Sequence, residues 1–342
     1  MFESTTGRTV QISGKSFLYF AGTSYLGLHV HPDWQALIRE GQARYGTHYG
    51  GSRLFTHVPD IYDRVEHFFA RQTGFEEALL CASGSLAGQL IGRSVPQDAE
   101  VIYLDAHPAV DSGRFAVRCQ SVDELLRRIE VTDKTSVWIF TNSVYPSKGV
   151  MRNWGWIGQL TKDKRFTIVI DDSHGLGVLG KDGLGGLRLN PQWPNHIGIV
   201  GLFSVGKAYS TPGAIVLGKK EYISVLRRFP LWGGASPPPP GPLFALMEGR
   251  DLIHAARKRL TALVDYAERA NAVYPVIHLR AFPVFGYEMV DLSEILYEKG
   301  VILSGFPYPT PDTSYTCRVV LNATHTVEDI DRVFEYIRSS VG

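Results

Sequence analysis

Phe203-Ser-Val-Gly-Lys-Ala-Tyr209 is the stretch that decides the fold predicted for this chain of 342 residues, because it places Lys207 between two apolar runs. Residues 196–202 before it and residues 213–218 after it both have the composition of buried strands. Most lysines are solvated surface charges. A lysine held between two buried strands loses solvent, so its pKa falls and its amine can act as a nucleophile toward a carbonyl group.

A second stretch, Phe166-Thr-Ile-Val-Ile-Asp-Asp-Ser-His174, has the pattern of a buried strand that ends in two carboxylates and a histidine. Asp171 and His174 are therefore expected where a parallel strand ends, the edge at which open α/β sheets bind ligands. By themselves the two residues are better explained as a capping aspartate and a buried structural histidine. Combined with Lys207, they favour a ligand site at this edge, where a carboxylate can keep a nearby ring nitrogen protonated and a histidine can donate a hydrogen bond.

Three further positions carry candidate chemistry, each with a structural alternative. Ser83, Gly84 and Ser85 follow a strand and open a helix, where free backbone N–H groups would seat a phosphate; an ordinary turn fits the same residues. His107 follows another strand end and, taken alone, is explained as a buried structural histidine. Arg318 alternates with apolar positions, so it is either a solvated strand arginine or a clamp for a carboxylate.

Composition excludes several classes of function. With 44% hydrophobic residues and a net charge of +1, the chain can bury a large core and a smaller one, but offers no basic surface for nucleic acid or an anionic membrane. No run approaches the ~20 apolar residues of a membrane span, and the N-terminus has no signal core. Cys81, Cys119 and Cys317 form no CxxC pair, which predicts buried thiols, a reducing cytoplasm and no structural zinc or other metal site.

Strand and helix patterns alternate through the middle of the chain, which predicts an α/β fold with a mostly parallel sheet covered on both faces. The expected strands are Glu77–Ala82, Glu100–Leu104, Ser136–Thr141, Thr167–Asp171, Ile197–Phe203 and Ala214–Leu217. A hairpin is expected around Ser13-Gly14, and helices are expected from Pro32 to about Arg44, from Asp60 to Gln72 and over Ser121–Ile129.

The pattern changes at Pro237-Pro-Pro-Pro240, which predicts a rigid extended link. A long helix is expected after it, from about Leu243 to Ala272, followed by a smaller α+β unit that ends in a helix. These features divide the chain into an N-terminal segment over residues 1–35, a large domain over residues 36–236 and a small domain with its linking helix over residues 237–342.

Gly175-Leu-Gly-Val-Leu-Gly180 fits the G-x-G-x-x-G motif of dinucleotide-binding folds. That motif needs a helix that begins within the glycines, so that the helix N-terminus lies under a pyrophosphate. The residues that follow, Lys181-Asp-Gly-Leu-Gly-Gly186, cannot hold a helix, and the acidic residue expected about 20 positions later is missing. The NAD interpretation is therefore rejected.

The order of the motifs, a strand end with Asp-x-x-His before a strand end with Ser-x-x-Lys, is similar to that of pyridoxal-phosphate (PLP) enzymes with the aspartate-aminotransferase fold. From about Tyr19 to its C-terminus the chain resembles the α-oxoamine synthases, a family that includes 8-amino-7-oxononanoate synthase and 2-amino-3-ketobutyrate CoA ligase. The matching segments are Tyr25-Leu-Gly-Leu28, Gly50-Gly-Ser-Arg53, Ser83-Gly84, Asp105-Ala-His107, Asp171-Asp-Ser-His174, Ser204-Val-Gly-Lys207 and Arg318-Val-Val-Leu-Asn-Ala-Thr-His325.

The resemblance implies PLP-dependent fold type I, with a mostly parallel seven-stranded sheet in the large domain and a smaller α+β C-terminal domain. It implies that Lys207 holds PLP as a Schiff base and abstracts the α-proton, while Asp171 meets the ring nitrogen and His107 stacks on the ring. It also places the substrate carboxylate on Arg318. The catalytic residues are then Lys207, His107, Asp171 and His174; the cofactor-binding residues are these four with Ser83, Gly84, Ser85, Asn142 and Ser204; and the substrate-binding residues are Arg318 and Tyr25.

One segment departs from the family pattern. Thr141-Asn-Ser-Val-Tyr-Pro-Ser-Lys-Gly149 stands where the family has T-E-G-V-F-S-M-D-G, so Asn142 replaces an acid and Lys148 replaces an aspartate. The residues on the cofactor side are retained, whereas those on the substrate side differ. We therefore expect a substrate unlike that of the best-known members.

The activity implied by the resemblance is the condensation of an amino acid with an acyl-CoA thioester, in a homodimer located in the cytoplasm. An aminotransferase or another PLP reaction on the same fold is the alternative. A third possibility is a non-catalytic partner subunit, because some relatives work in that way without the lysine. Retention of Lys207 together with Asp171 and His174 argues against this third possibility.

Overall fold

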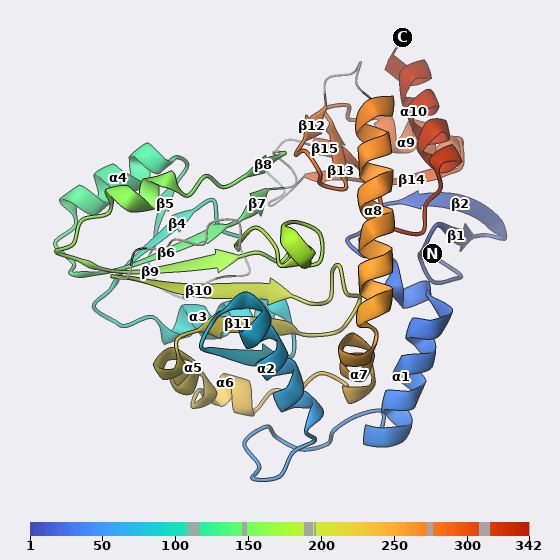
Figure 1. Cartoon of the computed structure of the whole chain (residues 1–342). Coiled ribbons are helices and arrows are strands. Elements are labelled where there is room, and N and C mark those ends of the chain that lie inside the picture. Colours follow the sequence, from blue (N-terminus) through green and yellow to red (C-terminus); the bar gives the residue numbers. More distant parts are fainter. Residues whose placement is uncertain are drawn as a thin grey trace.

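The computed structural model describes residues 1–107, 110, 116–145, 149–187, 194, 196–271, 276–307 and 315–341. Lys148 and Ala272, both named in the predictions from sequence, lie outside these described residues. The described chain folds around two sheets (Figure 1). The larger sheet lies on the left of the view, and the smaller sheet lies at the upper right with both chain termini.

The larger sheet has seven strands in the order β3-β11-β10-β9-β6-β4-β5. All neighbours pair in parallel except β11, which is antiparallel to both β10 and β3. This confirms the mostly parallel seven-stranded sheet. The strands are β3 Glu77–Cys81, β4 Glu100–Leu104, β5 Val117–Cys119, β6 Ser136–Asn142, β9 Arg165–Asp171, β10 Ile197–Ser204 and β11 Ala214–Gly218.

Alternation along each strand divides the interior into two cores, one on each face of the sheet. Leu79 belongs to one buried cluster and its neighbour Leu80 to the other. Both clusters are apolar because helices cover both faces, as expected for a parallel sheet. The helices of this part are α1 Pro32–Tyr45, α2 Ile61–Thr73, α3 Gly84–Ser94, α4 Val122–Val131, α5 Lys220–Arg227 and α6 Pro230–Gly233.

The smaller sheet joins the two ends of the chain. Its six strands have the order β1-β2-β14-β15-β13-β12, and β2 pairs in parallel with β14, with Leu18 opposite Val301. The expected hairpin at Ser13-Gly14 is confirmed by the antiparallel pairing of β1 with β2. The strands are β1 Thr9–Ile12, β2 Lys15–Phe20, β12 Ile277–His278, β13 Val284–Tyr287, β14 Val301–Pro307 and β15 Tyr315–Val320. The domain limits given above stay a prediction.

The expected long helix after the proline run is wrong in one respect, because the structure has two helices there. α7 covers Pro240–Glu248 and α8 covers Arg250–Ala270, and the two meet at Gly249. A Cβ atom at Gly249 would come within 2.7 Å of both the Ala245 carbonyl oxygen and the Trp34 ring, so only glycine fits this corner. From the corner, α8 extends alongside the elements of the smaller sheet (Figure 1).

Short elements complete the described fold. They are the 3₁₀ turns η1 Leu28–Val30, η2 Gly155–Gln159 and η3 Lys181–Gly183, the small antiparallel pair β7 Val144–Tyr145 and β8 Val150–Met151, and the helices α9 Leu292–Glu298 and α10 Val327–Val341. In the described part of the chain, the short turn η3 directly follows the Gly175–Gly180 motif, where a dinucleotide-binding motif needs a helix that begins within the glycines.

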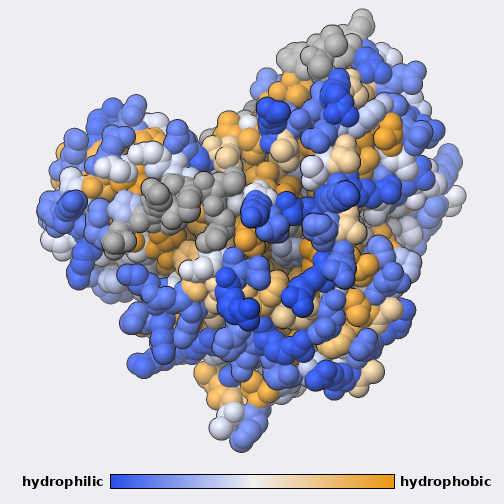
Figure 2. Space-filling model, viewed as in Figure 1, coloured by the Kyte–Doolittle hydropathy of each residue, from blue (hydrophilic) through white to orange (hydrophobic). Residues whose placement is uncertain are grey.

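Hydrophilic residues cover much of the face drawn in Figure 2, with smaller hydrophobic areas between them. Among the described residues, no helix combines the length and the apolar character needed to cross a membrane. The three cysteines are buried free thiols, as predicted.

Candidate active site

The predicted site residues follow the carboxyl ends of adjacent strands. Asn142 at the end of β6 lies opposite Asp171 at the end of β9, and Asp171 lies opposite Leu202 in β10. Ser204 ends β10, and β11 separates it from Cys81, the last residue of β3. One edge of the sheet therefore gathers side chains that are far apart in the sequence, which is the edge where open α/β sheets bind ligands.

Lys207 lies in a tight turn between β10 and β11. The Val205 N–H donates to the Gly213 carbonyl (3.1 Å), and the Thr211 N–H donates back to the Val205 carbonyl (3.1 Å), so the turn is closed by its own backbone. Burial lowers the pKa of the Lys207 amine, and the negative charge of Asp171 partly offsets this effect. The lowered pKa increases the fraction of neutral, nucleophilic amine, as the sequence predicts.

Asp171 and His174 are oriented by separate hydrogen bonds. The Ser173 N–H donates to the Asp171 carboxylate (2.9 Å), and Nδ1 of His174 lies 2.8 Å from the Tyr25 hydroxyl. Burial holds the pKa of His174 well below its usual value, and the positive charges of Lys207, His107 and Arg318 lower it further. His174 is therefore neutral at physiological pH, with Nδ1 occupied by Tyr25.

Asp172 points away from this group and into the glycine-rich loop. Its carboxylate accepts a hydrogen bond from the Ser143 hydroxyl and another from the Leu187 N–H (3.0 Å). A Cβ atom on Gly175 or Gly185 would lie 2.1 Å from its oxygens, so glycine is needed for the loop to wrap the carboxylate. Of the two adjacent aspartates, only Asp171 faces the lysine.

The N-terminus of α3 is where the sequence predicts an anion seat. Ser83 caps the helix by accepting from the Leu86 N–H (3.1 Å), and both Ser83 and Ser85 are exposed. Ser204 lies beside this turn, since a Cβ atom on Gly84 would be 3.5 Å from that of Ser204. Hydroxyl groups from two strand ends therefore flank a helix N-terminus, where the helix dipole favours a phosphate.

Asn142 ends β6 and His107 follows β4. Both strands lie on the other side of β9, which carries Asp171, from β10, the strand that precedes Lys207. Burial lowers the pKa of His107, which also responds to the charges of Asp171 and Lys207, so its imidazole belongs to the same group. The Asn142 side-chain amide donates to the Asp105 carbonyl (2.9 Å). Asn142 is thus tied to the segment that carries His107.

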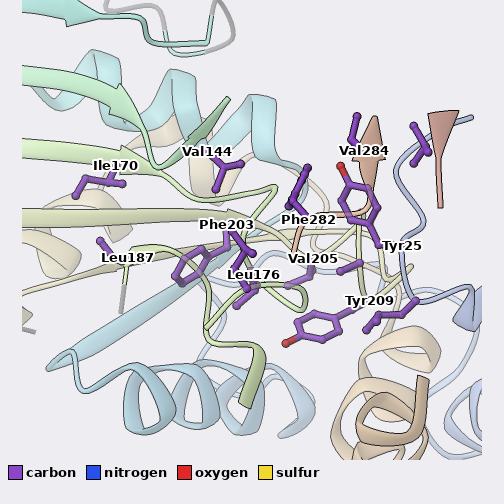
Figure 3. Close-up of a cluster of buried hydrophobic side chains, with 14 of the residues drawn as sticks. Tyr25, Val144, Ile170, Leu176, Leu187, Phe203, Val205, Tyr209, Phe282 and Val284 are labelled. Carbon is purple, nitrogen blue, oxygen red and sulfur yellow. The ribbon is translucent and has the colours of Figure 1, made fainter. Parts of the chain in front are cut away.

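Arg318 and Tyr25 reach the group from outside the larger sheet. Arg318 lies on β15, with its guanidinium carbon 4.7 Å from the centre of the Phe306 ring, and its charge acts on His174. Tyr25 is buried against Phe282 (ring centres 5.7 Å apart), and Figure 3 shows it among apolar side chains from both parts of the molecule. The sequence predicts that Tyr25 binds substrate; in the structure its hydroxyl contacts Nδ1 of His174.

Sequence reasoning missed the polar contacts around Asp105. Arg152 bonds to the Asp105 carboxylate and to the Tyr145 hydroxyl, and the same hydroxyl accepts from the Asn142 N–H. The signals available in the sequence were weak, because Arg152 follows a short strand without a motif. The one visible sign was Tyr145, which stands where the family pattern has phenylalanine.

Comparisons with known proteins agree with this fold. No family model matches the chain. The 8-amino-7-oxononanoate synthase of Lysinibacillus sphaericus is 28% identical over 99% of this chain and 92% of its own length. The serine palmitoyltransferase of S. paucimobilis has a TM-score of 0.86 at 18% identity, covering 99% of this chain and 91% of that one. The 8-amino-7-oxononanoate synthase of Francisella tularensis has a TM-score of 0.75 at 22% identity, covering 95% of this chain and 98% of that one.

The two solved structures establish the fold, and the sequence match extends over almost the whole chain. The chain is therefore similar in sequence to 8-amino-7-oxononanoate synthases over almost its whole length, and it has the fold of the solved serine palmitoyltransferase and 8-amino-7-oxononanoate synthase structures.

Proposed function

We propose that this protein is a PLP-dependent acyltransferase that condenses an amino acid with an acyl-CoA thioester. The observation that carries the proposal is the amine of Lys207, whose pKa is lowered by burial beside the carboxylate of Asp171. The chain's similarity to 8-amino-7-oxononanoate synthases over almost its whole length supports the reaction class.

The residues present fit PLP. The α3 N-terminus with Ser83, Gly84, Ser85 and Ser204 would take the phosphate, and Lys207 would hold the cofactor as an imine. The carboxylate of Asp171 would keep the ring nitrogen protonated, because an opposite charge favours the cationic form. When bound, PLP supplies an electron sink for a carbanion at the substrate α-carbon.

The other side chains would orient the reactants. Neutral His174, with Nδ1 occupied by Tyr25, can donate a hydrogen bond from Nε2. His107 would lie against the ring, and Arg318 would hold the substrate carboxylate with its planar fork. Lys207 Nζ would receive the proton that leaves the α-carbon of the amino acid, since a neutral amine is a competent base at physiological pH.

Asn142 supports a substrate different from that of the best-known family members. Its amide is neutral and its N–H₂ group donates to the Asp105 carbonyl, so it offers no negative charge where the family has an acid. The family's acidic partner for a donor group is therefore missing at this position. We infer a substrate that lacks the corresponding donor.

We further propose a homodimer in the cytoplasm. Leu54 and Phe55 follow the Gly50–Arg53 turn and are 62% and 61% exposed, which favours contact with a second copy of the chain. The three buried free thiols fit a reducing compartment. Light scattering during gel filtration would give the mass, and a monomer at micromolar concentration contradicts the dimer.

Attachment of PLP is tested by borohydride reduction of the purified protein followed by peptide mapping. The label is expected on Lys207 and is expected to vanish in Lys207→Ala. Lys220→Ala is a suitable control, because Lys220 begins α5 on the exposed surface. A label that persists in Lys207→Ala assigns the cofactor to another lysine.

The reaction is tested by mixing the protein with candidate amino acids and acyl-CoA thioesters. The proposal expects free CoA thiol that appears only when both reactants are present, together with a new carbon–carbon bond in the product. An α-keto acid without thiol release, with the cofactor left in its pyridoxamine form, would instead establish an aminotransferase.

A further inference from the structure

Arg152 makes an unusual set of contacts for a residue beyond the sheet. Its side chain is only 12% exposed, and one terminal nitrogen lies 3.2 Å from the Asp105 carboxylate and 2.5 Å from the Tyr145 hydroxyl. The guanidinium carbon is 4.8 Å from the centre of the Tyr145 ring. The cation is thus held both by a carboxylate and by an aromatic face, which fixes its plane.

The Tyr145 hydroxyl connects this arginine to two strand ends. It accepts from Arg152 and from the Asn142 N–H (3.1 Å), and it donates to the Leu104 carbonyl (3.3 Å). The hydroxyl also lies 3.1 Å from the Thr141 hydroxyl, so polar groups from both strand ends surround it. Through it, the end of β4 and the end of β6 are tied to one cation.

The segment that Arg152 holds is conformationally demanding. Asp105 has a φ of 52°, in the left-handed region that few residues other than glycine adopt. Its carboxylate is bonded to Arg152 and its carbonyl to the Asn142 amide (2.9 Å). The chain turns sharply at this point and reaches His107 two residues later. The turn at Asp105 thus sets where the His107 imidazole lies.

We propose that Arg152 is a positioning residue, which holds the Asp105 turn so that His107 and Asn142 keep their places beside the cofactor. The inference rests on the proposed function for its catalytic consequence. The geometric part concerns this chain's own residues, and it can be measured without the cofactor. A purely structural arginine, by contrast, would contribute stability and leave the surroundings of His107 unchanged.

The test compares three variants with a matched control. Arg152→Met removes the cation and keeps an unbranched apolar stem, and Arg152→Lys keeps a charge for Asp105 but lacks the planar fork. Tyr145→Phe keeps the ring and removes the hydroxyl, in case Arg152→Met fails to fold. Arg128→Met is the control, because Arg128 pairs with Glu100 (2.7 Å) at the opposite end of the same strand β4.

The first readout is the pKa of His107 in the cofactor-free full chain, followed by NMR of labelled histidine side chains and assigned with His107→Gln. Burial lowers this pKa, and the neighbouring charges are Asp171, Lys207 and His174. Arg152→Met and Tyr145→Phe are expected to release the turn and raise the pKa toward the ordinary value of about 6.5. In Arg152→Lys the pKa of His107 is expected to lie between that of the wild type and that of Arg152→Met. In Arg128→Met it is expected to match the wild type.

The second readout is the circular dichroism of bound PLP, which reports the groups against its ring, together with turnover. Arg152→Met is expected to change this band and lower kcat on the order of 10²-fold, since small misplacements of an active-site group have such effects. Unchanged His107 titration and an unchanged band, with a loss of Tm like that of Arg128→Met, would overturn the proposal. If wild-type protein takes no PLP on Lys207, the proposed function fails, and the cofactor-free titration still decides whether Arg152 positions His107.

Discussion

The hydroxyl of Tyr25 lies 2.8 Å from Nδ1 of His174, so a residue from the N-terminal segment completes a group built by the larger sheet. Because the pKa of His174 is far below its usual value, the imidazole is neutral and carries a single proton. When Tyr25 donates to Nδ1, that proton lies on Nε2. With the phenol as the donor, the imidazole can donate a hydrogen bond on its opposite side.

Tyr25→Phe is expected to keep PLP on Lys207 but to lower turnover on the order of 10²-fold, because the tautomer of His174 is no longer fixed. The pH titration of the cofactor absorbance is expected to shift as well. Tyr19→Phe is the control, since Tyr19 belongs to the same segment and lies in β2. Equal kinetics for the two variants would remove Tyr25 from the site.

The two adjacent aspartates are expected to differ in their response to amide substitution. Asp171→Asn is expected to bind PLP and lose activity roughly 10²-fold or more, because a neutral amide cannot keep the ring nitrogen protonated. Burial raises the pKa of Asp172 to about 7, so Asp172→Asn replaces a carboxyl group that is already partly neutral.

The measurement is steady-state kinetics with the absorption spectrum of each variant, alongside thermal unfolding. Asp172→Asn is expected to change stability more than kcat, since its partners are Ser143 and the Leu187 N–H rather than the lysine. Near-normal turnover in Asp171→Asn, with loss in Asp172→Asn, would reverse the two roles.

Arg318→Lys is expected to fold, to keep the PLP spectrum and to need far more amino acid for saturation. A lysine offers a point charge, whereas the guanidinium can hold a carboxylate with two parallel hydrogen bonds. Amino-acid titrations followed by the cofactor spectrum measure the effect. A surface arginine would change stability by no more than ~0.5 kcal/mol and leave the titration alone, and that outcome would leave the carboxylate site unassigned.

His325 makes the stability of the fold depend on pH. Its Nδ1 accepts from the Asn322 N–H (3.1 Å), its Nε2 contacts the Tyr19 carbonyl (3.0 Å), and its ring stacks on Phe20 with centres 4.1 Å apart. Burial lowers its pKa to about 4. The pKa of this histidine in the unfolded chain is about 6.5, so between this pH and the folded value only the unfolded chain takes up the proton. The contribution of neutral His325 to the free energy of unfolding is therefore complete above about pH 6.5 and is lost as the pH falls toward the folded value.

Urea unfolding of wild type and His325→Gln at two pH values measures this term. Glutamine does not titrate, so the advantage of the wild type is expected to shrink by about 2 kcal/mol between pH 7.5 and pH 5. Other buried histidines titrate in both proteins and cancel in the difference. A difference independent of pH would show that His325 is not forced to stay neutral.

The sequence predicted six of the seven strands of the larger sheet, because each of the six is a short, mainly apolar run. The seventh, β5, was not predicted, since it has only three residues and its central Arg118 is exposed. Lys207 and Asp171 were found because each comes directly after an apolar run. The contacts of Tyr25 and Arg152 could not be predicted, because they depend on how a side chain crosses between elements that are distant in the sequence. The break at Gly249 was missed because apolar residues continue on both sides of it.

The parallel pairing of β2 with β14 also fixes the order in which the molecule can be completed during synthesis. The strands of the larger sheet all lie between Glu77 and Gly218, so that sheet can form while the rest of the chain is still being made. Leu18 is synthesised early and must wait for Val301, its partner, which leaves the ribosome near the end. The β2 strand therefore keeps an unpaired edge on its β14 side until Val301–Leu303 has been made.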